Sequence, residues 1–163
     1  IRPCSDISPT MRIARAYLDS GDSSVHIGFA TYGFSASGWS DLDTGIVADS
    51  MCIRFAWVRG DLALVLVTDE GGTIKRRVTL DEGGTFSVAT TIGTGARPGL
   101  AISDTGVEHH LWRKSDGRMV TRVLDQQGNQ MIAETTVLAA GSAPPCIRLR
   151  LSESPRSLAS SHS

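Results

Sequence analysis

Residues 62–86 read LALVLVTDEGGTIKRRVTLDEGGTF, and this stretch decides the fold class. An apolar run at 62–67 and a second run at 73–80 are separated by the polar, glycine-containing segment 69–72. A second Gly-Gly segment at 81–84 follows, and a further run continues over 85–92. Glycine supplies the positive φ that tight hairpins need. The stretch therefore predicts three consecutive antiparallel strands joined by short turns.

The same pattern recurs along the chain. Segments that alternate apolar and other residues start at Pro9, Met51, Pro98 and Pro145, at spacings of 42, 47 and 47 residues. Alternation of period two is typical of a strand. Four short antiparallel strands in a unit of roughly 45 residues are the pattern of a β-propeller blade. The sequence therefore predicts an all-β chain of about three blades plus one strand.

A two-sheet β-sandwich is the alternative, because short strands with regular turns also describe that fold. The fixed repeat spacing favours blades, since sandwich strands need not repeat. The predicted organisation is an N-terminal segment at 1–8, propeller-like repeats at 9–151 and a flexible, Ser-rich tail at 152–163.

A short motif lies in the third predicted turn. Residues 79–86, TLDEGGTF, match the pattern Ser/Thr-x-Asp-x-Gly-x-Thr-Trp/Phe through Asp81, Gly83, Thr85 and Phe86. The Asp carboxylate can accept backbone N–H groups of the turn, and the aromatic residue packs below it. Weaker copies stand at 124–130 and 37–40. The motif resembles the Asp box of sialidase-like and related BNR-repeat propellers, where it is structural; the resemblance implies a fold and not an activity.

Three blades and one strand do not close a ring, because propellers have roughly four to eight blades. Open blades leave apolar faces that favour association. We therefore expect a homo-oligomer, with two copies giving six blades, or contacts with other subunits of an assembly.

Composition narrows the function classes. The 163 residues contain 16 Lys plus Arg and 17 Asp plus Glu, and this balance argues against nucleic-acid binding. Apolar runs are too short for a membrane helix, so no membrane insertion is expected. Cys4, Cys52 and Cys146 lack zinc-site spacing and are interpreted as small buried hydrophobes. Neither a cofactor motif nor a metal site is expected.

Three arginines occupy matching positions in the aligned repeats: Arg12, Arg54 and Arg148. On innermost strands they would line a central channel and bind carboxylates or phosphates. The alternative is that they pair with acidic residues between blades. Sialidases bind the substrate carboxylate with three arginines, but no good Phe/Tyr-Arg-Ile-Pro segment accompanies these.

For the remaining candidate residues, a structural role stands as the alternative to a functional one. Trp39, Trp57 and Trp112 are candidate sugar-stacking platforms, or else packing residues between blades. The neighbours His109 and His110 point to opposite faces of a predicted strand and are not expected to share a metal. Residues 59–61, Arg-Gly-Asp, lie in a predicted hairpin turn, which alone accounts for the glycine.

These observations favour a non-enzymatic structural and interaction module without catalytic residues. The resemblance implies a place among phage-tail or other virion components that mediate assembly or receptor attachment, or among extracellular binding proteins. A carbohydrate-binding, lectin-like propeller is the alternative. A fragment of a sialidase-type glycosidase is a third reading.

Overall fold

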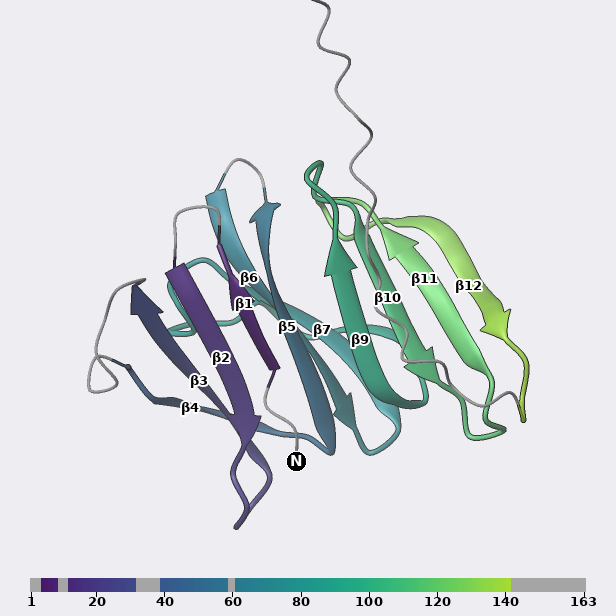
Figure 1. Cartoon of the computed structure of the whole chain (residues 1–163), viewed down its shortest axis with the longest axis horizontal. Coiled ribbons are helices and arrows are strands. Elements are labelled where there is room, and N and C mark those ends of the chain that lie inside the picture. Colours follow the sequence, from purple (N-terminus) through teal and green to yellow (C-terminus); the bar gives the residue numbers. More distant parts are fainter. Residues whose placement is uncertain (1–3, 9–11, 32–38, 59–60, 142–163) are drawn as a thin grey trace, which may run out of the picture.

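The computed structural model describes residues 4–8, 12–31, 39–58 and 61–141, which form three four-stranded antiparallel sheets (Figure 1). Strands follow one another in chain order within each sheet. The first sheet contains β1 (Cys4–Ile7), β2 (Arg12–Leu18), β3 (Ser24–Thr31) and β4 (Leu42–Val47). The second contains β5 (Ser50–Val58), β6 (Asp61–Glu70), β7 (Thr73–Thr79) and β8 (Thr90–Thr94). The third contains β9 (Ala96–Ile102), β10 (Glu108–Arg113), β11 (Met119–Leu124) and β12 (Gln130–Leu138). The all-β prediction is confirmed.

The first sheet begins earlier than the repeat alignment predicts. Cys4–Ile7, expected in a separate N-terminal segment, forms β1 and pairs with β2 from Cys4↔Ala16 to Ile7↔Ile13. Arg12 therefore lies on a second strand, whereas Arg54 lies on a first strand. The alignment missed this because β1 is only four residues long and contains two polar residues. The predicted strand at Pro145 and the tail lie outside the described residues.

The predicted turns of the second sheet are present, with one shifted strand. The turn between β6 and β7 places Gly71 and Gly72 at φ 61° and 81°, values that other residues rarely adopt. The motif turn at 81–84 follows β7 as predicted. The fourth strand, expected at 85–92, is observed as β8 at Thr90–Thr94. Residues 85–89 instead extend the connection to that strand.

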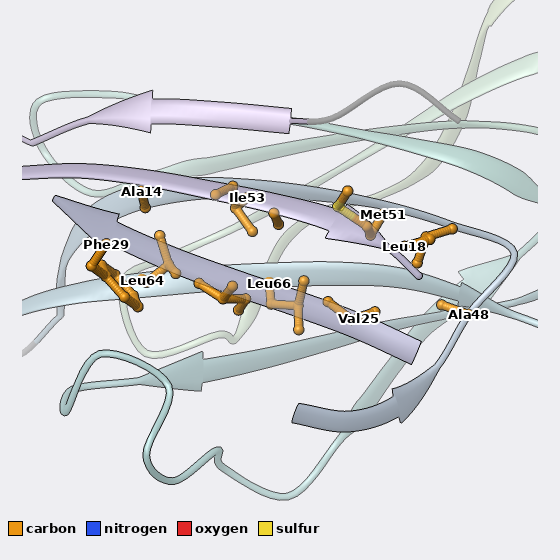
Figure 2. Packing of buried hydrophobic residues seen from close by; sticks show 11 residues of the cluster. Ala14, Leu18, Val25, Phe29, Ala48, Met51, Ile53, Leu64 and Leu66 are labelled. Carbon is orange, nitrogen blue, oxygen red and sulfur yellow. The ribbon is translucent and has the colours of Figure 1, made fainter. Parts of the chain in front are cut away.

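The second sheet lies between the other two, and its two faces bury different side chains. Leu64 and Leu66 of β6 join the cluster shared with the first sheet (Figure 2), whereas Val65 and Val67 join the cluster shared with the third. Because side chains alternate along a strand, a strand covered on both faces needs an unbroken apolar run. The sequence LALVLV supplies it, and Ala63–Asp69 are all buried.

Contacts between sheets are concentrated on the first strands. β1 packs against β5, and β5 packs against β9, with β2 and β6 also contributing (Figure 1).

No helix in the described residues is long and apolar enough to span a membrane.

Candidate anion-binding hollow

The arginines predicted to share a channel have different partners. Arg12 on β2 forms an ion pair with Glu82, which lies in the turn after β7. Arg54 on β5 donates from Nη1 to the carbonyl oxygens of Ile53 (2.8 Å) and Ser5 (3.4 Å). Both side chains thus connect the first sheet to the second, but only Arg12 does so by pairing with an acidic residue, since Arg54 donates to backbone carbonyl oxygens. Arg148 lies outside the described residues.

The three tryptophans differ in exposure. Trp112 is completely buried, and its indole N–H donates to the carbonyl oxygen of Thr94 at 2.9 Å. Trp39 is half-buried, with the Arg15 guanidinium 4.6 Å from its ring centroid. Trp57 is 41% exposed. In this structure Trp112 packs between sheets and is closed to a sugar, while Trp57 presents the most accessible ring.

The motif turn is held by its aspartate. Asp81 accepts the backbone N–H of Thr85 (2.8 Å), the Thr85 hydroxyl (2.7 Å) and the Thr79 hydroxyl (2.7 Å). These bonds, led by the Thr85 backbone N–H, lower the pKa of Asp81 to about 2. Phe86 packs against the cluster between the first and second sheets, and Gly83 has φ 88°. The turn is therefore structural.

The weaker copies of the motif keep parts of this geometry. Asp125 accepts the backbone N–H of Asn129 at 2.8 Å, and the Asn129 side chain (3.0 Å) takes the place of the Thr85 hydroxyl. Ser40 donates its backbone N–H to Phe29 O and accepts the Phe29 N–H at its hydroxyl. Ser87 makes the same two bonds with Val78. The resemblance between copies thus has a hydrogen-bonding basis in all three sheets.

A buried ionisable cluster joins the second and third sheets, and the sequence analysis missed it. Arg76 of β7 donates to both carboxylate oxygens of Glu108 on β10, and His110 lies 2.9 Å from the same carboxylate. All three side chains are less than a tenth exposed. Burial lowers the pKa of His110 more than Glu108 raises it. Because solvent barely reaches the cluster, we interpret it as an inter-sheet joint.

The functional candidate is a hollow at the crossover from the second sheet to the third. It has a volume of about 390 Å³, and Thr94, Gly95, Arg97, Arg113 and Lys114 line it. Arg97 and Arg113 are exposed. Among the described residues, neither arginine forms an ion pair, whereas Lys114 pairs with Glu134 at 2.8 Å. The hollow therefore carries a net positive charge.

The backbone around the hollow is constrained. A Cβ on Gly95, which has φ 144°, would lie 2.3 Å from the Arg113 carbonyl oxygen, so a larger residue is excluded there. Arg97 has φ 57°, although the residue before a proline normally favours extended backbone. Strained non-glycine residues are enriched at functional sites because the surrounding structure must hold them.

Strand pairing brings the cations of the hollow together. Arg113 pairs with Ala96, the neighbour of Arg97, across the β9–β10 ladder, next to a register shift between Leu111 and Arg113. The two arginines lie on neighbouring strands but share no motif, and no role was predicted for them from the sequence. The signal that points to them is basic residues at both ends of one predicted hairpin.

The sequence matches no family model and no curated protein. Among the described residues, no group of three or more His, Cys, Asp or Glu side chains is placed to hold a metal ion.

Proposed function

We propose that this chain is a non-enzymatic interaction module that binds an anionic group of a glycan in the hollow beside Arg97 and Arg113. One observation carries the proposal: two exposed arginines, Arg97 and Arg113, line the same concave site, and neither forms an ion pair among the described residues. Guanidinium groups bind carboxylates through paired N–H donors, which gives both affinity and orientation.

The size and setting of the hollow favour an acidic sugar. Its volume of about 390 Å³ is at the lower end of the range for small-molecule sites, roughly 300–1,000 Å³. The Thr94 hydroxyl accepts from Lys114 at 3.3 Å and offers a further polar contact for a sugar hydroxyl. A sialic or uronic acid combines such hydroxyls with a carboxylate.

The sheet arrangement supports the blade interpretation within this proposal. A propeller places the first strands of its blades around a common axis and the fourth strands at the rim. Here the first strands of neighbouring sheets pack on one another, β1 on β5 and β5 on β9, and each sheet is a four-stranded meander. The third sheet packed on the second favours blades over a two-sheet sandwich.

Assembly is the second candidate function, and β12 favours it. Eight of its nine residues, from Gln130 to Val137, are exposed, and Met131, Ile132 and Val137 are each more than half exposed. A second copy, or another subunit of a virion-type assembly, would cover this strand. Light scattering of the purified chain tests self-association. A particle of twice the 17.3 kDa monomer mass supports a dimer that covers β12, and a monomer at high concentration contradicts the dimer.

Calorimetry with the full chain tests the ligand. N-acetylneuraminic acid and glucuronic acid should bind at low salt, and more weakly as salt rises, whereas neutral galactose should not bind. Equal binding of galactose, or no binding of either acid, would overturn the ligand assignment. A fluorogenic sialoside should show no turnover, and turnover would contradict the non-enzymatic part.

A further inference from the structure

Two cysteines that are 48 residues apart in the chain meet between the first and second sheets. The Sγ atoms of Cys4 on β1 and Cys52 on β5 are 3.4 Å apart, and both are free thiols. Cys52 is buried, whereas Cys4 is half-buried at the sheet edge. Cys52 is a small buried residue as the sequence analysis expected, but the contact between the two sulfur atoms was not predicted.

The surroundings of Cys4 stabilise a thiolate. The backbone N–H of Ile53 donates to its sulfur at 3.3 Å, and Arg54 Nη1 lies 3.7 Å away. When Cys4 is ionised, the Cys52 thiol is a further donor. The Cys52 hydrogen bond, followed by Ile53 and Arg54, outweighs burial and lowers the pKa of Cys4 to about 6. The same contact and burial raise the pKa of Cys52.

We propose that Cys4 and Cys52 form a thiol–disulfide exchange site that reacts with low-molecular-weight disulfides such as oxidised glutathione. The Cys4 thiolate attacks one sulfur of the disulfide, forms a mixed disulfide and releases one glutathione thiolate. Cys52 then gives up its proton and attacks Cys4 Sγ, which forms the Cys4–Cys52 bond and releases the second glutathione. The protein loses two electrons and two protons, and the oxidised glutathione becomes two thiols.

The product would covalently link the first strands of two sheets. The sulfur atoms would close from 3.4 Å to the bond length of about 2.05 Å. In the reduced protein β1 is held against β5 by weaker contacts, such as Phe55 N–H to Asp6 Oδ2 at 2.8 Å. The exchange would therefore link the first sheet covalently to the second under oxidising conditions and release the link under reducing conditions.

Peptide mapping of the full chain in a Cys146→Ser background tests the site. Trypsin separates the two thiols, because Arg12 and Arg54 follow Cys4 and Cys52 respectively. After oxidised glutathione, we expect one linked peptide pair, lighter by two hydrogen atoms and restored by reductant. Cys52→Ser should trap glutathione on Cys4, and Cys4→Ser should remain largely unmodified. A folded protein that gives no linked pair, or traps glutathione on Cys52 instead, would overturn the proposal.

A second measurement needs no cysteine variant at the site. Alkylation of the native Cys146→Ser protein by iodoacetamide should modify Cys4 about tenfold or more faster than Cys52 at pH 7, because only the thiolate reacts. The rate at Cys4 should have its midpoint near pH 6. A midpoint at the ordinary thiol value, or faster reaction of Cys52, would contradict the assigned roles of attacking and resolving thiol.

Discussion

Arg76 on β7 and Glu108 on β10 form a bidentate salt bridge between the second and third sheets, with Arg76 Nε 2.7 Å from Glu108 Oε2. The Glu108 side chain is completely buried and that of Arg76 nearly so. Burial alone raises the pKa of Glu108, but the hydrogen bonds from Arg76 and His110 outweigh it, and the carboxyl pKa is lowered. The inter-sheet contact thus contains a charged joint inside an apolar interface.

Breaking this joint on one side should destabilise the protein strongly. We expect Arg76→Ala to lower the free energy of unfolding in urea by about 3–5 kcal/mol, since it leaves a buried carboxylate without its partner. The control is Arg118→Ala, which removes an exposed pair with Asp116 and should cause no resolvable change. Replacing both Arg76 and Glu108 by Met should recover much of the loss. A single variant as stable as the wild type would contradict the geometry.

Acid should weaken the same joint through His110. Burial lowers the pKa of His110, so the folded protein binds a proton less readily than the unfolded chain, whose histidine pKa is about 6.5. The free energy of unfolding should therefore fall as the pH drops through 6.5. Urea unfolding between pH 7.5 and 5 measures this slope, which should shrink in His110→Gln and persist in His109→Gln. Stability that rises on acidification would refute the sign.

The motif aspartate should titrate far below an ordinary carboxyl group. NMR of the Asp81 side-chain carboxyl carbon should give a pKa of about 2, and Thr85→Val should raise it because one hydroxyl donor is lost. The stabilising contribution of Asp81 is present above pH 3.8 and is lost as the pH falls toward 2. Asp125 in the same sample is the internal control, and its pKa should not change on Thr85→Val. An Asp81 value unchanged by Thr85→Val would place the hydroxyl elsewhere.

Trp112 packs so closely on the second sheet that adding one methyl group at the contact should destabilise the protein. A Cβ added to Gly93 would lie 2.3 Å from Trp112 Cζ2, so Gly93→Ala should cost about 1–3 kcal/mol of unfolding free energy. Gly99→Ala is the matched control, because its nearest neighbour, Leu111 Cβ, would be at 3.9 Å. Thermal or urea unfolding distinguishes them. Equal stability of the two variants would show that the indole lies elsewhere.

Ligand binding in the hollow should depend on its arginines. A charge-assisted hydrogen bond contributes roughly 1.5–3 kcal/mol, so Arg97→Ala and Arg113→Ala should each weaken binding of an acidic sugar about tenfold or more. Arg118→Ala should leave the affinity unchanged, since Arg118 is exposed on the next hairpin and does not line the hollow. The calorimetric titration described above provides the measurement. Equal losses in all three variants would indicate nonspecific charge attraction.

Much of the fold was accessible from local sequence. The run 62–67 and the turns around Gly71 and Gly83 predicted β6, β7 and the motif turn, because a short apolar run bounded by turn residues and the positive φ of glycine are local features. The start of the first sheet was not accessible. β1 has four residues and a mixed composition, and only its pairing with β2 makes it a strand.

The candidate sites lay beyond sequence reasoning for a related reason. The sequence identified Arg12 and Arg54 by their matching positions in the repeat alignment. Because β1 precedes the aligned strand, Arg12 lies on the second strand of its sheet and Arg54 on the first strand of its own. It assigned no role to Arg97 and Arg113, which a ladder register brings together. It interpreted Cys4 and Cys52 as small buried hydrophobes and did not predict that their sulfur atoms are in contact.

Local sequence predicted that the chain is all-β and placed most of its strands and hairpin turns, although it missed β1 and placed β8 too early. Those properties follow from side-chain alternation and backbone preferences within a few residues. The contacts of Arg76 with Glu108 and of Cys4 with Cys52, and the hollow shared by two arginines, became visible with the three-dimensional structure. Each of these contacts joins strands from different sheets or the two strands of a hairpin. The stacking that creates the two inter-sheet contacts is set by packing of the whole molecule, and the hollow depends on the register of the β9–β10 hairpin.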